Sequence, residues 1–523
     1  MADRPALKRC VDLPGRLLSI PVSPGSSSVA GALAPSRIAN NRLCHSGDLA
    51  RTNGPIPTAL ALTNGPALTI SHARSLRALP LHLLRTSSWA DQWPVRLDAN
   101  ELATLLSTLR AGSDAASARL AENAIGYATG FSTGGLAGSR SGSWPPKAPR
   151  DVVAALHRIL TRSRFLKGSR SCFPLDTAVA QMLPFVQARQ PITVLTIGFP
   201  FKQHDNGLKA AGPWPDLAEL GALLRLKELH DAVAAVYPPG LRVVVLNDGG
   251  YSRPRGWSEM RRYRRQLRRY AQLIGLDDAV RFCDQSCFVA QLLGARGWAR
   301  REQYRRRFRE LITVLAGNPR PPDSATGIDQ RLVEKLPGML LANVPSFRDI
   351  LSSLVYSVPV PARAGVEPRR WACEVLAWPD FLCSPELSPE VASARREVLG
   401  CAWQDTVNFV AASLADAAVG VAQSFPPHVR LATVASRPGC SGFSYLGGST
   451  LLPWHGTGCL DGRGLLCAEF LVSLDHRNFL PVYCDLIGDD QPLLMVPFAR
   501  TQYAQGRRRV DPTLLATARL RHR

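Results

Sequence analysis

The strongest pattern along the chain is a pair of continuous apolar runs separated by a segment with helical apolar spacing. The runs at 192–197 (ITVLTI) and 241–250 (LRVVVLNDGG) are short and rich in β-branched residues, as in strands buried on both faces. Between them, residues 215–237 carry apolar side chains three and four positions apart, and Pro215 suits a first helical turn. We therefore predict a βαβ unit with parallel strands and a right-handed crossover.

Similar patterns predict the remaining elements. Helical spacing predicts helices at 98–124, 151–166, 173–187, 257–274, 286–316 and 388–424. Short apolar runs predict strands at 279–285, 429–436, 442–446, 464–474 and 493–499. The fold class that we expect is α/β, a Rossmann-like and mostly parallel sheet with flanking helices, to which the late strands are added.

Changes in composition divide the chain into three parts. Residues 1–150 are rich in Ala, Ser, Gly and Pro and predict an irregular or partly disordered N-terminal extension. Residues 151–505 hold the predicted α/β domain, and residues 506–523 form a basic tail that we expect to fray. No apolar run reaches the length of a membrane span, and the N-terminus does not resemble a secretory signal, so we expect a cytoplasmic protein without a membrane partner.

Positive charge is concentrated in one stretch. The net charge is +22, and residues 253–309 hold sixteen arginines and five acidic residues, which is about half of the excess. Arginines interleaved with tyrosine, as in RRYRRQLRRY (261–270), can hold phosphates and stack bases, as a nucleic-acid groove requires. No recognised nucleic-acid motif accompanies them, so the simpler interpretation is a pair of solvated helix faces, and we do not expect a nucleic-acid partner.

The twelve cysteines are scattered and include no CxxC pair. Cys283 and Cys287 are the closest two, four positions apart, whereas a structural zinc site needs paired ligands at short spacing. We therefore expect no metal site and interpret the cysteines as buried and reduced.

Two turns at predicted strand ends carry residues suited to acid–base chemistry. The sequence GFPFK leaves the first strand with Phe199, Phe201 and Lys202, and Asp248 follows the next strand. Ligands of open α/β sheets bind beyond the carboxyl ends of the strands. If the two strands are neighbours, Lys202 and Asp248 face one crevice, where a cation and a carboxylate can bind an anion and move a proton.

A third turn, LLPWHGTG at 451–458, contains the most conspicuous of the ten histidines. His455 lies between Trp454, which can wall a pocket, and Gly456, which permits close backbone approach. The alternative interpretation is a loop histidine bonded to a backbone carbonyl.

Taken together, these stretches resemble the isonitrile (isocyanide) synthase family, which includes pyoverdine/paerucumarin-type enzymes and the dityrosine-precursor enzyme. The resemblance covers about residues 151–500 and departs from the family pattern at Glu219, which is displaced from the acidic position, and at Val434, where the family often has a histidine. The matching positions, in order, are Gly198–Lys202, Lys209, Pro215-Asp216, Pro239-Gly240, Asp248-Gly249 and Pro453–Gly456.

The resemblance implies an enzyme that joins the amino group of tyrosine or tryptophan to a carbon from ribulose 5-phosphate and forms an isonitrile. It implies no metal or nucleotide cofactor, and its partners are these small-molecule substrates. It assigns catalysis to Lys202, Asp248 and His455. It assigns substrate binding to Phe199, Phe201, Lys209, Asp216, Arg430 and Trp454.

Four alternatives stay open at this point. A related enzyme could form an N-formyl amino acid, as in the dityrosine branch, or an enzyme on the same scaffold could run a changed reaction on an amino acid or sugar phosphate. The Arg-rich segment 253–309 could bind nucleic acid, or the chain could be an inactive relative kept for interactions. The oligomeric state also stays open.

Overall fold

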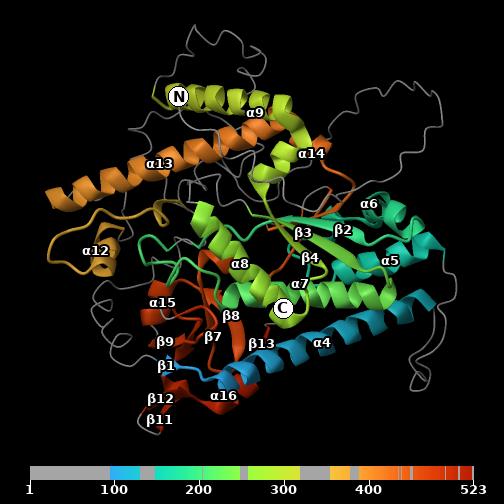
Figure 1. Ribbon diagram of the computed structural model, residues 1–523, viewed down its shortest axis with the longest axis horizontal. Coiled ribbons are helices and arrows are strands. Elements are labelled where there is room, and N and C mark those ends of the chain that lie inside the picture. The colour runs from blue at the N-terminus through green and yellow to red at the C-terminus, as the bar shows by residue number, and fades with distance from the viewer. Residues whose placement is uncertain are drawn as a thin grey trace, which may run out of the picture. The chain divides into compact units, whose positions relative to one another are not determined.

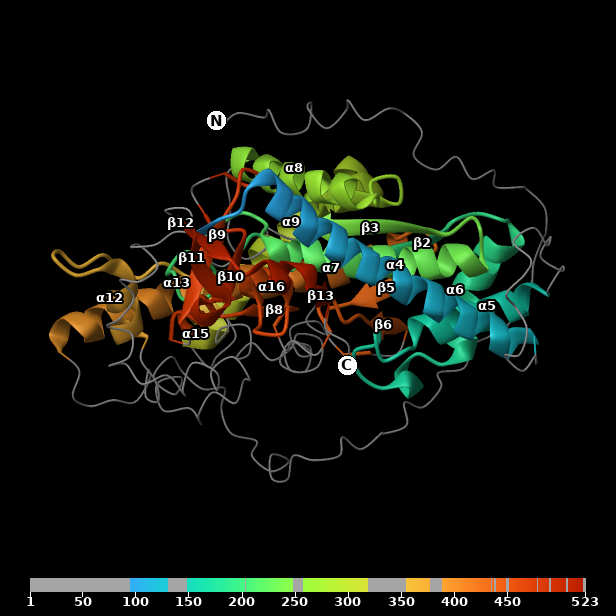
Figure 2. The same ribbon diagram turned by 90° about the horizontal axis from the view of Figure 1, so that it is seen from below.

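In the computed structural model, helix α7 (Leu217–Val236) is the central element and lies between two β-sheets (Figures 1 and 2). It contacts β3 (Leu241–Asn247) of one sheet and both β7 (Thr457–Leu460) and β8 (Leu465–Glu469) of the other. The structure describes residues 95–129, 148–202, 204–247, 257–317, 354–376, 388–433, 435–436, 439–447, 451–476, 478–488, 491–504 and 507–520.

The first sheet has five strands in the order β4-β3-β2-β5-β6, and every pair in it is parallel. Numbered by chain order, the strands run 3-2-1-4-5, which is the arrangement of a doubly wound sheet with its switch point between β2 and β5. This confirms the predicted α/β class and the mostly parallel sheet. Its strands are β2 (Ile192–Ile197), β3, β4 (Val280–Asp284), β5 (Val429–Ala432) and β6 (Cys440–Gly442).

The second sheet is mixed and has the order β1-β9-β10-β7-β8-β13. The late strands β5 and β6 join the first sheet as expected, whereas the strands after them form this separate sheet. Its remaining members are β1 (Val95–Arg96), β9 (Phe479–Tyr483), β10 (Leu494–Pro497) and β13 (Arg519–Leu520). A two-stranded hairpin, β11 (Thr501–Ala504) with β12 (Arg507–Val510), accompanies it.

The helices cover and connect these sheets. α8 (Trp257–Ile274) and α9 (Gln285–Gly317) match the predicted ranges closely, and α9 bends at Gly294, whose φ is 63°. Of the helices in the described part of the chain, none is long and apolar enough to span a bilayer. The others are α4 (Ala99–Thr129), α5 (Pro149–Leu160), α6 (Leu175–Gln187), α12 (Pro368–Val375), α13 (Pro389–Ala418), α14 (Val421–Ser424), α15 (Leu471–His476) and α16 (Pro512–Ala516).

Helix α7 is buried around its whole circumference, which explains why it carries apolar residues on every face. Its charged residues are paired inside the core. Glu228 accepts a 2.8 Å hydrogen bond from Arg225, both side chains are fully buried, and Arg164 also pairs with Glu228. Pairing of this kind is what allows buried charges to persist.

Segments near both ends of the described chain differ from the expected extension and tail. β1 pairs with β9, and α4 packs along α7, so residues 95–129 belong to the folded body. Residues 507–520 form β12, α16 and β13. In both segments, apolar side chains such as Leu105, Leu109 and Leu514 are buried, and their burial outweighs the polar composition around them.

Candidate active site

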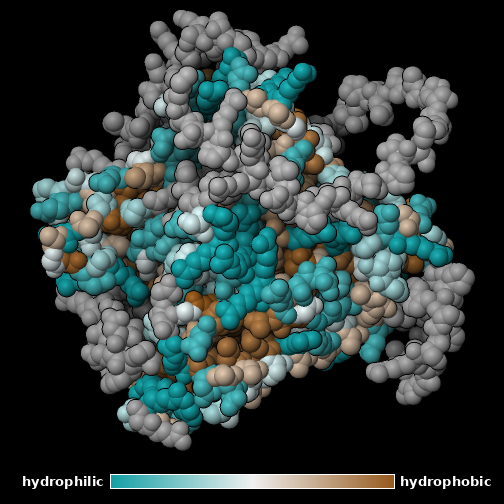
Figure 3. Space-filling view, viewed as in Figure 1, coloured by the Kyte–Doolittle hydropathy of each residue, from teal (hydrophilic) through white to brown (hydrophobic). Residues whose placement is uncertain are grey.

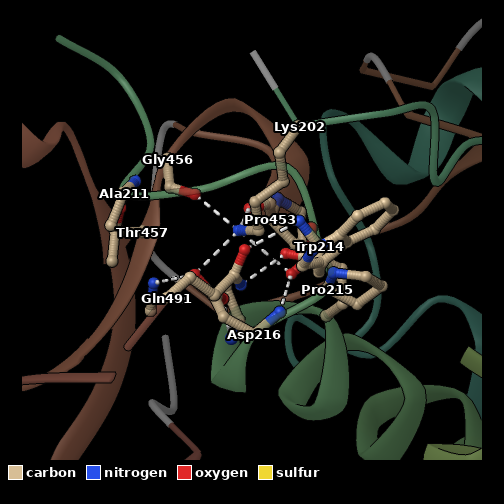
Figure 4. Close-up of polar contacts among 12 residues, drawn as sticks. Lys202, Ala211, Trp214, Pro215, Asp216, Pro453, Gly456, Thr457 and Gln491 are labelled. Atoms are coloured by element: carbon tan, nitrogen blue, oxygen red, sulfur yellow. Dashed lines mark hydrogen bonds and ion pairs between the residues drawn. The ribbon is translucent and has the colours of Figure 1, made fainter. Parts of the chain in front are cut away.

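The turn after β2 and the turn before β7 meet around the ammonium group of Lys202, as Figure 4 shows. The side chain is only 1% exposed. Its Nζ donates to the carbonyl oxygens of Pro453 at 3.2 Å and Gly456 at 2.6 Å. It also forms ion pairs with Asp216 Oδ2 and Glu219 Oε2, both at 3.0 Å.

The two carboxylates come from the N-terminus of α7. Asp216 is the N-cap and accepts from the amide of Ala218 at 2.8 Å, while Glu219 Oε2 accepts from the amide of Asp216 at 3.0 Å. This capping box places negative charge where the helix dipole favours it. The amide of Gly458 on β7 donates to Asp216 Oδ2 at 3.1 Å and ties the helix to the second sheet.

The approach to this helix is fixed by Gln491. Its Oε1 accepts from the amide of Trp214 at 2.8 Å, and its Nε2 donates to the carbonyl of the same residue at 2.9 Å (Figure 4). The Thr457 hydroxyl accepts from the amide of Ala211 at 2.9 Å. The segment between Lys202 and Asp216 is thereby held against the second sheet at two points.

Burial and charge oppose each other in the cluster. Burial alone would lower the pKa of Lys202, but the carboxylates of Asp216 and Glu219 outweigh it, so the net pKa is raised. Burial raises the pKa of Glu219, and the nearby Asp216 raises it further against the opposing effect of Lys202. The ammonium therefore stays charged, while the affinity of the Glu219 carboxylate for a proton is increased.

Tyr263 on α8 connects the cluster to a small cavity. Its hydroxyl donates to Glu219 Oε1 at 3.2 Å, and its ring packs on Phe201 with 5.0 Å between ring centroids. Burial, followed by the charge of Glu219, raises the pKa of Tyr263 well above its usual value, so its O–H is retained as a donor. The cavity is lined by Phe199, Phe201, Asn247, Met260, Tyr263 and Arg264.

The cavity lies where β2 and β3 end, at the edge expected for a ligand. Phe199, directly after β2, has a φ of 51°, which is uncommon for a residue other than glycine. Asn247 Nδ2 donates to its carbonyl oxygen at 2.7 Å and supports this conformation. Phe199 also packs on Trp454, with ring centroids 5.0 Å apart.

Trp454 and His455 form part of the short helix η4 (Pro453–His455). Trp454 is buried, and it leaves no space for a side chain at Gly198, where an added Cβ would lie 2.7 Å from the indole. His455 is half-buried, and its ring lies 6.3 Å from that of Trp454. The backbone carbonyls of Pro453 and Gly456, which flank Trp454 and His455, accept from Lys202.

The structure does not bring the other predicted residues into this cluster. Lys209 is fully buried and donates from Nζ to Ser357 Oγ at 2.9 Å, and burial lowers its pKa to about 7. Arg430 lies on β5 with an exposed side chain. Asp248 and Val434 lie outside the described residues, although the preceding Asn247 lines the cavity.

Three residues at the site were not predicted from the sequence as functional. Glu219 stood out only as a departure from the family pattern, although Asp216 and Glu219 have the spacing of a capping box. Tyr263 and Arg264 lie in the Arg-rich segment. Met260, Tyr263, Leu267 and Tyr270 on α8 have helical spacing and are buried. This spacing predicts a buried face of the helix, but it is hard to recognise among the many arginines of the segment.

The remaining arginines of α8 face outward. Figure 3 shows hydrophilic side chains over this helix. Arg262 stacks over Trp214 at 4.0 Å from the ring centroid, and Arg269 donates to the carbonyl of Leu486 at 2.9 Å. The exposed members are Arg261, Arg262, Arg265, Arg268 and Arg269. Within the described ranges, no group of three His, Cys, Asp or Glu side chains is placed to hold a metal ion.

Comparison with known proteins finds similarity in this region. The family described as "Pyoverdine/dityrosine biosynthesis protein" matches residues 183–330, which include β2, the Lys202 turn, α7 and α8. Over this range the chain is similar to the family. The resemblance inferred from the GFPFK and DG turns, which lie within this range, is thus confirmed, whereas the PWHG turn lies outside it.

The curated relatives match over short stretches. The L-tryptophan isonitrile synthase of Fischerella ambigua is 30% identical over 100 residues, 18% of this chain and 31% of that protein. The L-tyrosine isonitrile synthase of Xenorhabdus nematophila is 32% identical over 100 residues, 18% of this chain and 30% of that protein. An isocyanide synthase–NRPS hybrid of Aspergillus fumigatus is 40% identical over 79 residues, 14% of this chain and 5% of that protein.

The matched stretches thus span less than a third of each of these relatives. Among solved structures, the PvcA protein of Pseudomonas aeruginosa aligns with 65% of this chain and 99% of its own, at 18% identity and a TM-score of 0.38.

Proposed function

We propose that this chain is an isonitrile synthase-like enzyme that converts the amino group of an aromatic amino acid, tyrosine or tryptophan, into an isonitrile, with ribulose 5-phosphate as the carbon donor. The observation that carries the proposal is the buried cluster of Lys202, Asp216 and Glu219 next to a cavity at the carboxyl ends of β2 and β3. The family match over residues 183–330 and the named activities of the relatives support it.

The proposed reaction requires a site that accepts a proton from the amine, holds the aromatic side chain and holds an anionic group. Residues around the cavity are suited to each of these tasks. An amine attacks a ketone only when it is neutral, so a group must accept its proton. Glu219 fits this role, because its pKa is raised and Tyr263 links it to the cavity by a hydrogen bond. Protons then pass between the substrate and Glu219 through the tyrosine hydroxyl.

An aromatic side chain and an anionic group must also be held. Phe201, which is half-buried at the cavity, offers apolar surface for the aromatic ring, whereas Phe199 is fully buried and packs on Trp454. Arg264 is half-buried at the same cavity, its Nε donates to the carbonyl of Met260 at 3.4 Å, and it forms no ion pair with a described residue. A guanidinium in that position suits a carboxylate or phosphate.

Product analysis tests the proposal directly. Incubation of the protein with tyrosine or tryptophan and ribulose 5-phosphate, followed by mass spectrometry, is expected to show an isonitrile. A formamide in its place would identify the alternative of an N-formyl amino acid enzyme. Neither product from either amino acid would contradict the proposal.

Glu219→Gln tests the site. The substitution keeps the shape but removes the proton-carrying group, so turnover is expected to fall by about 10²- to 10⁴-fold with the fold retained. Glu397→Gln, an exposed position on α13, serves as the matched control and should leave turnover unchanged. Equal activity of the two variants would remove Glu219 from the mechanism.

A further inference from the structure

Two cysteines face each other across the hairpin that completes the site. Cys459 on β7 and Cys467 on β8 are direct partners in the antiparallel register, and their Sγ atoms are 3.2 Å apart. Directly opposite residues in such a pair have Cα atoms about 4.5–5.5 Å apart, which lies within the range that disulfides span. Closing a bond of about 2.0 Å therefore requires the sulfur atoms to approach by only about 1.2 Å.

The environment of the pair allows such a reaction. Cys459 is 1% exposed and packs with Leu471, Leu474 and Met495, whereas Cys467 is half-buried at the edge of the same cluster. A small-molecule oxidant can therefore reach Cys467 first, with Cys459 already in place behind it.

The hairpin also carries contacts of the candidate site. The amide of Gly458, next to Cys459, donates to Asp216. Gly456, whose carbonyl accepts from Lys202, lies so close to the backbone of Glu469 that an added Cβ would be 2.7 Å from its oxygen. A displacement of either strand at the cysteine pair would therefore act on the contacts of Asp216 and Lys202.

We propose that Cys459 and Cys467 form a reversible disulfide that distorts the hairpin and slows the enzyme. With glutathione disulfide as the oxidant, the Cys467 thiolate attacks one sulfur and releases one glutathione thiolate. The Cys459 thiolate then attacks Cys467 and releases the second. The two thiol protons are taken up by the two glutathione thiolates, so the protein is oxidised by two electrons and the glutathione disulfide is reduced by two.

Peptide mapping without reduction tests the covalent part. The full chain is equilibrated with excess glutathione disulfide, and a peptide pair linking Cys459 to Cys467 is expected, which dithiothreitol should separate. Cys467→Ser must abolish this link, and Cys459→Ala is the second variant should the first fold poorly. Two free thiols, a stable glutathione adduct on Cys467, or a link to another cysteine would each overturn the proposal.

Turnover tests the functional part, which rests on the proposed function. Oxidation is expected to lower wild-type turnover on the order of tenfold to a hundredfold, because small displacements of catalytic groups cost that much. Cys467→Ser should keep its turnover under the same oxidant, and Cys401→Ser, at an exposed cysteine on α13, should remain as sensitive as wild type.

The two failures are distinguishable. If the peptide link forms but turnover is the same in the oxidised and reduced wild type, the regulatory role is refuted. If the reduced protein makes no isonitrile, the proposed function is refuted. Peptide mapping alone then shows whether the disulfide between Cys459 and Cys467 forms.

Discussion

Four oxygen atoms surround the ammonium group of Lys202, and they determine whether it can donate a hydrogen bond to a substrate. Two carbonyls and two carboxylates accept from an ammonium that has three hydrogens, so no donor is left over for a substrate. Its role is therefore to hold the charge of Asp216 and Glu219 at the start of α7. Under the proposed function, proton transfer is therefore assigned to Glu219, which the Tyr263 hydroxyl links to the cavity.

Tyr263→Phe isolates that link. The ring is retained against Phe201, so packing should hold, but the hydroxyl between the cavity and Glu219 is lost. We expect turnover to fall by about tenfold to a hundredfold, with little change in KM for the amino acid. Steady-state kinetics together with a melting curve measure both quantities. Tyr304→Phe, on α9, is the control, and equal turnover in the two variants would contradict the relay.

Lys209 offers a test of stability rather than catalysis. Burial lowers its folded pKa to about 7, while the unfolded chain keeps a value of about 10.4. Between these values the unfolded state binds one proton more, so wild-type stability should rise with pH. From pH 7 to pH 9, wild type should gain about 2–3 kcal/mol relative to Lys209→Met in urea unfolding. If the unfolding free energies of wild type and Lys209→Met changed with pH in parallel, Lys209 would be charged in the folded state.

Some of these residues could be predicted from sequence and others could not. Lys202 was visible because an unusual turn followed a recognisable strand. Glu219 was not, because a glutamate three residues after an aspartate looks like ordinary helix capping, and only the tertiary structure places it on Lys202. Asp216 was expected to bind substrate, and the structure shows its carboxylate holding helix, strand and lysine together.

At the scale of elements, β7 and the first turn of α7 approach each other at Gly458. A Cβ at this position would lie 2.6 Å from the amide nitrogen of Ala218 and 3.0 Å from Asp216 Oδ1. Gly458→Ala should therefore force the strand away from the helix and cost about 1–3 kcal/mol of unfolding free energy. Turnover should fall as well, because the hydrogen bond to Asp216 is displaced.

Gly462 in the next turn provides the control. No atom lies within 4 Å of a Cβ built there, so Gly462→Ala should change stability by less than about 0.5 kcal/mol. Urea unfolding of the two variants gives the comparison. A Gly458→Ala protein as stable and active as Gly462→Ala would mean that the close contact with α7 is not important for the site.

Elements with strong local periodicity were predicted well, and those defined by distant pairing were not. The ranges of β2, α8 and β4 agree with the sequence pattern within one residue or so, because periodicity within each segment is enough to define them. The apolar stretch 464–474 was expected to be one strand, but it is divided into β8 and α15. An unbroken apolar run suits either element when both are buried, so pattern alone does not separate them.

At the scale of the whole molecule, the second sheet is assembled from opposite ends of the described chain. β1 pairs with β9, and β13 pairs with β8, while α16 and β13 pack on α4. Sequence patterns do not report such pairings, because β1 and β13 are each two residues long and gain their stability only from distant partners. Composition alone therefore assigned residues 1–150 to an extension and residues 506–523 to a frayed tail, although a helix is predicted at 98–124.

Truncation after Ala504 tests this assembly. The deletion removes β12, α16 and β13, together with the buried side chains of Val510, Leu514 and Leu520. Each such side chain contributes about 1.5–3 kcal/mol, so the total is comparable to the roughly 5–15 kcal/mol that stabilises a typical protein. We therefore expect the truncated protein to lose cooperative unfolding or to aggregate, as measured by circular dichroism melting and size-exclusion chromatography.

A pair of point variants separates apolar burial from charge in the same segment. Leu514→Ala should cost about 2–5 kcal/mol, because a fully buried leucine is removed from its contact with the body. Arg519→Ala removes a basic, exposed side chain from the same segment and should be close to neutral. If the segment were a frayed basic tail, both variants and the truncated protein would have the same melting temperature as the wild type. A loss confined to Leu514→Ala and the truncation would show that the end of the described chain stabilises the sheet that carries Gly456 and Gly458 to the site.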